Sequence, residues 1–290
     1  MALTAANGET HTVERDVVPR GAYRLPGAGR DGVLVWRDGA LVRAVSVEGE
    51  TALVRAWVGG GRVRFRAEAP TRAAGLAAIE RMRFALGTDH DLSVFHRRFR
   101  RDALVGPVIR RRPWLRPRRR PEPFEALAWA VCEQLVESRR AAGIERSIVR
   151  RLGARSSCGS YRLPPTAARL AAAAPAELDA CGLAPKRSLA LIKAGREVAS
   201  GRADLAEHER SWRRLLAIPN IGNWTIEMLA FEGQGRDDKI PALDLAYVIL
   251  VGRLAHGGRR ATEEEVRAFF APYEEYAALA GIYALGRRYL

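Results

Sequence analysis

A change of pattern near residue 121 restricts the fold of this chain more than any other feature. Before residue 92, short runs of β-branched, apolar and aromatic residues alternate with turn clusters such as Arg37-Asp38-Gly39 and Gly59-Gly60-Gly61, a pattern typical of strands. Residues 73–86 then show helical spacing. From Pro121 onward, apolar segments at helical spacing follow one another, with Pro or Gly at most junctions. We therefore predict an α+β protein, in which an N-terminal antiparallel sheet domain precedes an all-α domain.

Positive charge is concentrated between these two parts. The chain carries a formal charge of +15, and residues 93–120 alone hold 11 Arg against Asp102, which gives +10. We accordingly divide the chain into a β-rich domain (1–92), an Arg/Pro-rich connecting segment (93–120) and a helical domain (121–290). Clustered basic charge favours a polyanion partner, because binding phosphates releases condensed counterions. An arginine-rich, solvated surface remains the alternative at this point.

Several classes of protein are disfavoured by composition. No apolar run approaches the roughly 20 residues that span a bilayer, and the N-terminus lacks the basic and apolar parts of a signal peptide. Cys132, Cys158 and Cys181 are too few and too scattered for a disulfide framework, a four-cysteine cluster or a tetrahedral zinc site. We expect a cytoplasmic protein with no membrane contact and no cofactor.

The most informative motif is a short turn between two helical segments, Pro219-Asn220-Ile221-Gly222. Pro219 ends the first helix, and Gly222 leaves room for a close approach of backbone or phosphate. The second helix begins at this turn, so its unpaired N–H groups and positive dipole end can hold a phosphate without reading base sequence. A helix-hairpin-helix of this kind grips a DNA backbone. The alternative is an ordinary corner between packed helices.

Asp244 stands 22 residues beyond Gly222, directly before the apolar segment 245–254. Asp is among the best residues for capping a helix N-terminus, so a structural role is one interpretation. The other is a catalytic carboxylate that faces a nucleotide delivered by the hairpin. Both roles can belong to one side chain.

Taken in order, these motifs resemble the helix-hairpin-helix base-excision glycosylases, most closely the AlkA-type DNA-3-methyladenine glycosylases. The resemblance covers nearly all of residues 90–290. It is carried by Pro219-Asn220-Ile221-Gly222-Asn223-Trp224-Thr225, Gly233-Gln234-Gly235-Arg236 and Pro241-Ala242-Leu243-Asp244-Leu245, with support from Pro123-Phe124-Glu125-Ala126-Leu127, Glu133-Gln134-Leu135-Val136 and Cys181-Gly182-Leu183.

The resemblance implies a role for each matching residue. Asp244 would be catalytic, stabilising positive charge on the sugar, and Leu135 would be wedged into the duplex where the target base has left. The base pocket would comprise Trp224, Met228 and Tyr283. Contacts with DNA would come from Gln134, Leu135, Pro219, Asn220, Ile221, Gly222, Asn223 and Thr225. Backbone carbonyls that would hold a structural Na⁺ or K⁺ at the hairpin belong to Leu216, Ile218 and Ile221.

Trp224 separates two chemistries within this family. Bifunctional members have a Lys at this position that attacks the sugar and cleaves the strand through a Schiff base. A Trp cannot do so, and the resemblance therefore implies a monofunctional enzyme that uses water. An alkylated purine already carries positive charge, so the protein must supply extrusion of the nucleotide, an aromatic face and a carboxylate.

The predicted function is therefore hydrolysis of the N-glycosidic bond of alkylated purines, such as 3-methyladenine and 7-methylguanine, which initiates base excision repair. The predicted partner is duplex DNA containing alkylated bases, bound by a monomer at the bacterial nucleoid. Glu137, Met228 and Ile282 depart from the family pattern and leave the substrate range open. The alternatives are a non-catalytic helix-hairpin-helix DNA-binding protein and a glycosylase for another lesion, such as a deaminated purine.

Overall fold

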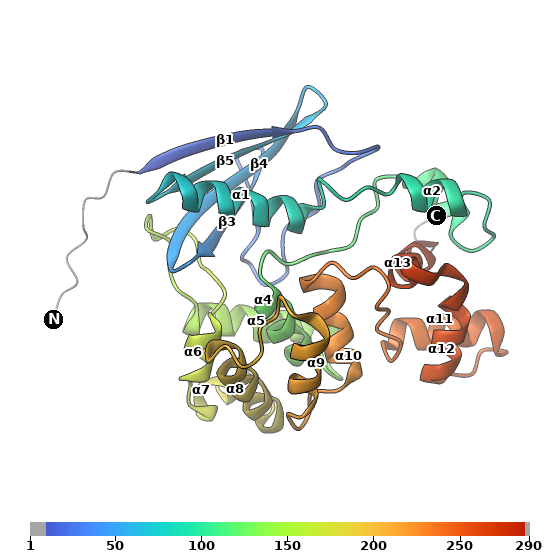
Figure 1. Ribbon diagram of the computed structural model, residues 1–290. Coiled ribbons are helices and arrows are strands. Elements are labelled where there is room, and N and C mark those ends of the chain that lie inside the picture. The colour runs from blue at the N-terminus through green and yellow to red at the C-terminus, as the bar shows by residue number, and fades with distance from the viewer. Residues whose placement is uncertain (1–9, 288–290) are drawn as a thin grey trace.

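The computed structural model describes residues 10–287 and consists of a sheet domain above two helical lobes (Figure 1). The predicted order, an N-terminal antiparallel sheet followed by helices, is confirmed. None of the helices among these residues is long and apolar enough to cross a membrane.

The sheet has five antiparallel strands in the order β1-β5-β4-β3-β2. Their bounds are β1 His11–Val17, β2 Val35–Arg37, β3 Ala40–Val47, β4 Glu50–Gly59 and β5 Arg62–Ala69. One face is covered by α1, Arg72–Leu86 (Figure 1). Thr71 caps the start of this helix by accepting a hydrogen bond from the Ala74 N–H at 3.1 Å. Gly87, whose φ of 65° suits a residue without Cβ, ends it.

Strand β3 is buried on both faces of the sheet, because successive side chains of a strand point in opposite directions. Leu41 and Val45 pack in the core shared with α1. Val42 and Ala44 lie on the other face, in a cluster with Tyr161 and Leu163 of the helical part. The apolar run of β3 therefore attaches the sheet to the helices beneath it.

The first helical lobe contains the predicted hairpin. Its helices are α4 Pro123–Glu133, α5 Ser138–Leu152, α6 Ala167–Ala171, α7 Pro175–Asp179, α8 Pro185–Ala199, α9 His208–Leu216 and α10 Asn223–Met228, which continues as the π-helical turn η1 Leu229–Gly233. Trp129 of α4 is 1% exposed at the centre of its core. The core of the lobe buries apolar side chains from each of these helices and also Ile218 and Ile221 of the hairpin turn.

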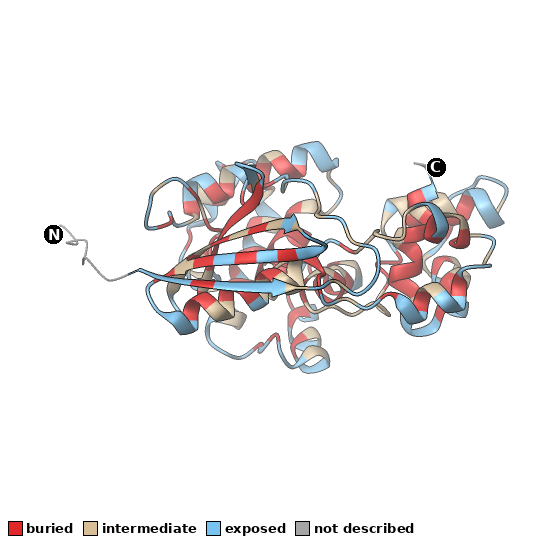
Figure 2. Ribbon diagram, turned by 90° about the horizontal axis from the view of Figure 1, so that it is seen from above, coloured by how far each residue is buried: buried red, intermediate tan, exposed pale blue. Residues whose placement is uncertain are grey.

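The second helical lobe combines two distant parts of the chain. It comprises α2 Ser93–Phe99, α3 Gly106–Arg111, α11 Leu245–Ala255, α12 Glu263–Phe270, the 3₁₀ segment η2 Ala271–Tyr276 and α13 Ala277–Gly286. Figure 2 shows it standing beside the first lobe. Phe95 and Phe99 of α2 pack with Tyr247 and Phe270 in its core. The basic segment 93–120 thus contains two helices of this lobe, and only residues 112–120 pass to the first lobe.

A buried ion cluster around Arg120 joins the sheet domain, this crossing segment and the first lobe. An Nη of Arg120 lies 2.8 Å from Asp31 Oδ2 and 3.4 Å from Glu125 Oε1, and its Nε lies 3.7 Å from Glu232 Oε2. Arg43 of β3 pairs with the same Glu125. The Trp129 indole N–H donates to Asp31 at 3.1 Å. The one guanidinium of Arg120 thus lies close to carboxylates from three parts of the chain.

Carboxylates outnumber guanidiniums around this cluster. Burial raises the pKa of Glu232 to about 7, against the lowering effect of Arg120. Burial and mutual repulsion raise the pKa of Glu133 to about 7, and burial likewise raises that of Glu145. One oxygen of Glu145 has no hydrogen-bond partner among residues 10–287. These carboxyls therefore hold protons in the folded protein that the unfolded chain releases.

We predict that stability falls as pH rises from about 4.5 to about 7, because the folded state binds more protons than the unfolded state across that window. Glu145→Gln removes one titrating group. Above pH 7, the free energy of unfolding of the variant is therefore expected to exceed that of the wild type by on the order of 1–3 kcal/mol. The two proteins should converge near pH 4.5, below which neither carries this charge.

Urea denaturation across this pH range measures the difference. Glu48→Gln, at an exposed turn between β3 and β4, is the matched control and should leave the profile unchanged. Equal destabilisation of Glu145→Gln at every pH would show that its carboxyl is not a buried proton acceptor.

Candidate active site

The predicted hairpin connects α9 to α10 through an exposed turn. The Ile221 N–H closes the turn by donating to the Ile218 carbonyl at 3.0 Å, and Asn220 has a φ of 69°, a conformation that Asn tolerates. Within residues 10–287, no side chain caps the start of α10. At Gly222 no atom of the described chain lies within 4 Å of the place where a Cβ would stand. An uncapped helix start with open space beside it can receive an external anion.

Gln134, at the end of α4, fastens that helix to the hairpin. Its side-chain amide donates to the Asn220 carbonyl at 2.8 Å and to Thr225 Oγ1 at 2.7 Å. The backbone carbonyl of Gln134 accepts a hydrogen bond from the Arg187 guanidinium at 2.8 Å. The Gln134 side chain thus makes its hydrogen bonds within the protein. It fixes the end of α4 relative to the hairpin, and both carry residues predicted to contact DNA.

Leu135 follows with a fully exposed side chain, at 107% relative exposure, on a backbone with φ of 52°. A positive φ is unfavourable for a residue with a branched side chain. The neighbouring backbone is held by the Arg187 bond and by the Gln134 amide. An exposed leucine kept in a strained conformation is a feature of functional sites rather than of stability.

The residues predicted for the base pocket divide into two groups. Trp224 and Met228 are half-buried on the same helix, α10. Tyr283 of α13, by contrast, is fully buried in the core of the second lobe, and its hydroxyl donates to the Leu115 carbonyl at 2.9 Å. A base could reach this ring only by displacing packed side chains. We therefore do not retain Tyr283 as a pocket residue.

Asp244 begins α11 and caps it, as one of the two interpretations requires. Its Oδ1 accepts from the Ala246 N–H at 2.8 Å. The other carboxylate oxygen, Oδ2, has no hydrogen-bond partner among residues 10–287, and the residue is half-buried. Leu243 and Leu245 on either side are 50% and 54% exposed. One oxygen of Asp244 is thus structural, and one is available between two exposed apolar side chains.

Glu227 was not singled out from the sequence, yet it connects the hairpin helix to the loop that carries Asp244. Its Oε2 accepts from the Ala242 N–H at 3.2 Å, and its other oxygen pairs with Arg267 of α12. Burial raises the pKa of Glu227, while Arg267 opposes that shift. A carboxylate in the apolar run of α10 and η1 was the available signal, because such a group is buried only with a partner.

The fold is that of helix-hairpin-helix glycosylases. The chain superimposes on a 3-methyladenine DNA glycosylase from Archaeoglobus fulgidus with a TM-score of 0.76 at 21% identity, covering 87% of this chain and 88% of that one. An 8-oxoguanine glycosylase/lyase from Clostridium acetobutylicum gives a TM-score of 0.67 at 14% identity, over 88% of each chain.

Sequence similarity points to one type within this class. The chain is 24% identical over 202 residues to the DNA-3-methyladenine glycosylase of Bacillus subtilis, a match that covers 67% of each protein. It is 32% identical over 142 residues to DNA-3-methyladenine glycosylase 2 of Escherichia coli, covering 47% of this chain and 50% of that protein. This chain therefore spans only about half the length of the Escherichia coli relative. No protein-family model matches the chain. The resemblance to AlkA-type helix-hairpin-helix glycosylases is confirmed in sequence and in fold.

We predict that Leu135→Gly stabilises the protein by roughly 0.5–1 kcal/mol, because glycine adopts a positive φ without the penalty of a side chain. The exposed leucine contributes no packing that the substitution would remove. Leu135→Ala, which keeps the strained backbone, should leave stability nearly unchanged. Guanidinium denaturation of the three proteins tests this, and a less stable Leu135→Gly would mean that the side chain supports the fold.

Proposed function

We propose that this protein is a monofunctional DNA glycosylase that hydrolyses the N-glycosidic bond of alkylated purines in duplex DNA. The observation that carries the proposal is the state of Asp244: one carboxylate oxygen caps α11, and the other has no hydrogen-bond partner among residues 10–287. The loop that holds Asp244 is bonded to the hairpin helix α10 through Glu227. This arrangement supports a carboxylate acting on a nucleotide that the hairpin presents.

Each remaining part has a role in this reaction. The open start of α10 at Gly222 binds backbone phosphate. Leu135 enters the duplex and fills the place of the extruded nucleotide, whose removal from the stack is easiest for a damaged base. The Trp224 ring provides an electron-rich face for a cationic purine. The free oxygen of Asp244 stabilises the positive charge that develops on the sugar as the bond to the base breaks.

Water is the nucleophile in this proposal. Trp224 occupies the position where bifunctional relatives have lysine, and an indole cannot form a Schiff base. Lys239 is the lysine nearest to Asp244 in the sequence, and its ammonium lies 3.3 Å from Asp238 and over the Trp212 ring at 5.9 Å. This ion pair holds it in another role. The product is an intact strand with an abasic site.

A monovalent cation suits the hairpin. Carbonyls of Leu216, Ile218 and Ile221 lie at the C-terminal end of α9 and in the following turn, where the helix dipole is negative. The Ile218 carbonyl accepts one N–H bond and keeps a second lone pair. We propose that these carbonyls hold Na⁺ or K⁺, which would add positive charge where a phosphate binds.

An uncharged lesion is the second candidate substrate. Burial raises the pKa of Glu133 to about 7, with repulsion from Glu145 and from Asp244 contributing. A neutral base leaves more easily when it is protonated, and a carboxyl that keeps its proton near neutral pH can supply one. Competition among duplexes with methylated, deaminated and oxidised purines separates the two candidates.

We expect Asp244→Asn to reduce release of 3-methyladenine and 7-methylguanine from methylated duplex DNA by at least roughly 10²-fold, because a charge-stabilising group is lost. Asn is also a good N-cap, so the variant should remain folded and should still bind DNA. Strands should break only after alkali in the wild-type reaction, and borohydride should trap no covalent complex.

Asp204→Asn is the matched control, because Asp204 accepts from the Ala206 N–H at 2.9 Å with the same spacing but outside the site. Unchanged base release by Asp244→Asn would reduce Asp244 to a helix cap. No release by the wild type, with tight DNA binding, would favour a non-catalytic binding protein.

We further predict that Leu135→Ala and Leu135→Gly both lower base release from duplex DNA, by roughly tenfold or more, because no side chain then occupies the gap in the stack. Release from single-stranded methylated DNA should change much less, since no stack needs to be opened. The ratio of duplex to single-strand rates is the measurement. Equal losses on both substrates would contradict a wedge.

A further inference from the structure

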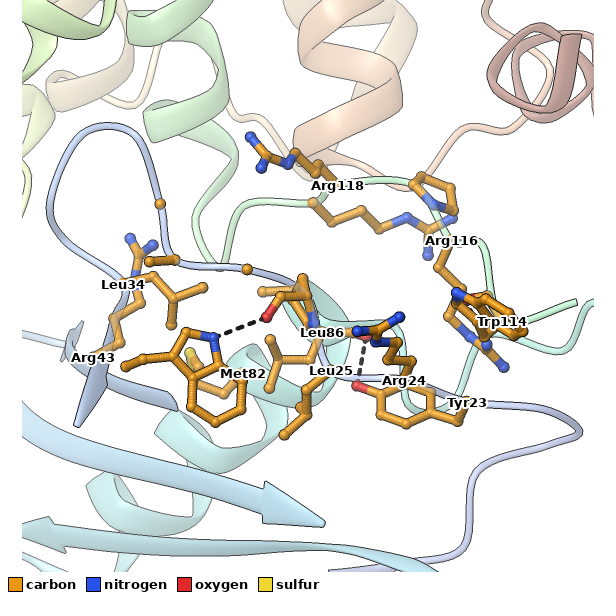
Figure 3. A pocket seen from close by; sticks show the side chains of 18 of the residues that line it. Tyr23, Arg24, Leu25, Leu34, Arg43, Met82, Leu86, Trp114, Arg116 and Arg118 are labelled. Carbon is orange, nitrogen blue, oxygen red and sulfur yellow. Dashed lines mark hydrogen bonds between the residues drawn. The ribbon is translucent and has the colours of Figure 1, made fainter. Parts of the chain in front are cut away.

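One cavity lies away from the hairpin and from Asp244, between the sheet domain and the crossing segment. Residues 23–31 and Trp36 form one wall and residues 112–120 the other, and the cavity has a volume of about 940 Å³ (Figure 3). This volume is at the upper end of the range of about 300–1,000 Å³ for small-molecule sites. Neither Asp244 nor any residue of the hairpin turn lines it.

One end of this cavity is held in place by bonds between its two walls. Arg116 donates to the Ala22 carbonyl at 2.7 Å and to the Arg20 carbonyl at 3.0 Å. Its guanidinium also stacks over the Tyr23 ring at 5.0 Å. The Tyr23 hydroxyl donates to the Leu86 carbonyl at 2.9 Å, as the dashed line in Figure 3 shows. A ligand would therefore meet walls that are already ordered.

The lining is strongly basic. Eight arginines line the cavity against a single carboxylate, that of Asp31, which Arg120 already neutralises. Arg43, Arg116, Arg119 and Arg120 are engaged within the protein. Arg24 and Arg118 are exposed, and neither forms a hydrogen bond or ion pair with residues 10–287. Two guanidiniums are thus available at this cavity for an anion.

Aromatic and apolar surface accompanies this charge. Trp36 is 46% exposed although its indole N–H is fixed by a bond to the Pro26 carbonyl at 3.2 Å. Trp114 lines the wall formed by the crossing segment (Figure 3). Leu25, Met82 and Leu86 provide an apolar surface between them. Indole faces beside free guanidiniums are suited to a flat ring that carries an anionic group.

We propose that this cavity binds a nucleotide, with its base against Trp36 or Trp114 and its phosphate at Arg24 or Arg118. An unpaired guanidinium would bind the phosphate, and the exposed indole and the apolar side chains would bind the base. An anion without a ring would use only the guanidinium. The nucleotide is either free or an unpaired unit of a nucleic-acid strand. This site is independent of the proposed glycosylase reaction, so base release and nucleotide binding can fail separately.

Calorimetric titration of the full chain with thymidine monophosphate tests the proposal, with thymidine and inorganic phosphate as comparison ligands. We expect the monophosphate to bind more tightly than either. Arg24→Ala and Trp36→Leu should each weaken it at least about fivefold, because one removes a charge-assisted contact and the other a stacking face. Arg62→Ala is the matched control, since Arg62 is an exposed arginine outside the cavity. It should leave binding unchanged, and thermal melts establish that all variants are folded.

A short oligothymidylate distinguishes the two sources of the nucleotide. The site takes a strand if the oligomer binds more tightly than the monophosphate, competes with it, and loses affinity in Trp36→Leu. The site takes the free nucleotide if the monophosphate binds as tightly as the oligomer. Three results would overturn the proposal: phosphate binding as tightly as the monophosphate and insensitive to Trp36→Leu, tighter binding of a glutamate-rich peptide, or no binding at millimolar concentration.

Discussion

The arrangement of the whole molecule depends on the side chain of Arg120. Its guanidinium lies close to Asp31 of the sheet domain, Glu125 of α4 and Glu232 of η1. Without this guanidinium, several buried carboxylates would face one another, a situation more costly than the absence of an ion pair. The cluster therefore sets where the sheet sits on the helical lobes. It also sets where residues 112–120 cross between those lobes.

The candidate site depends on this placement because its parts come from different lobes. The hairpin and Leu135 belong to the first lobe, whereas Asp244 caps the start of α11 in the second lobe. Glu227 bridges them by holding the Ala242 N–H and Arg267. A shift between the lobes would separate the Asp244 carboxylate from α10, the helix that presents the nucleotide in the proposed reaction. One ion pair and one hydrogen bond, both made by Glu227, thus connect the two halves of the site.

Local signals made much of this predictable from the sequence. The helical spacing of apolar residues in 73–86 predicts α1 to within one residue at its start. The turn at Pro219 lies between two helices, as predicted. Strand β1 carries only a weak local signal, because it is an edge strand with Val13 as its one buried side chain. Helices α2 and α3 were hidden by the arginines around them. Their apolar residues pack against α11 to α13, which a local pattern cannot reveal. Tyr283 and Glu227 likewise depend on tertiary contacts.

Structural and functional roles coincide at the positions that matter most. Asp244 satisfies the start of α11 with one oxygen, and this bond restrains the carboxylate that carries the other oxygen. A side chain held in this way loses little freedom when a substrate arrives, so the cap contributes to preorganisation of the site. Leu135 shows the opposite relation, because its backbone conformation is unfavourable and its side chain makes no packing contribution. The two interpretations of Asp244, as a helix cap and as a catalytic group, therefore support each other. The conformation of Leu135 brings no benefit within the protein and is explained only by contact with a binding partner.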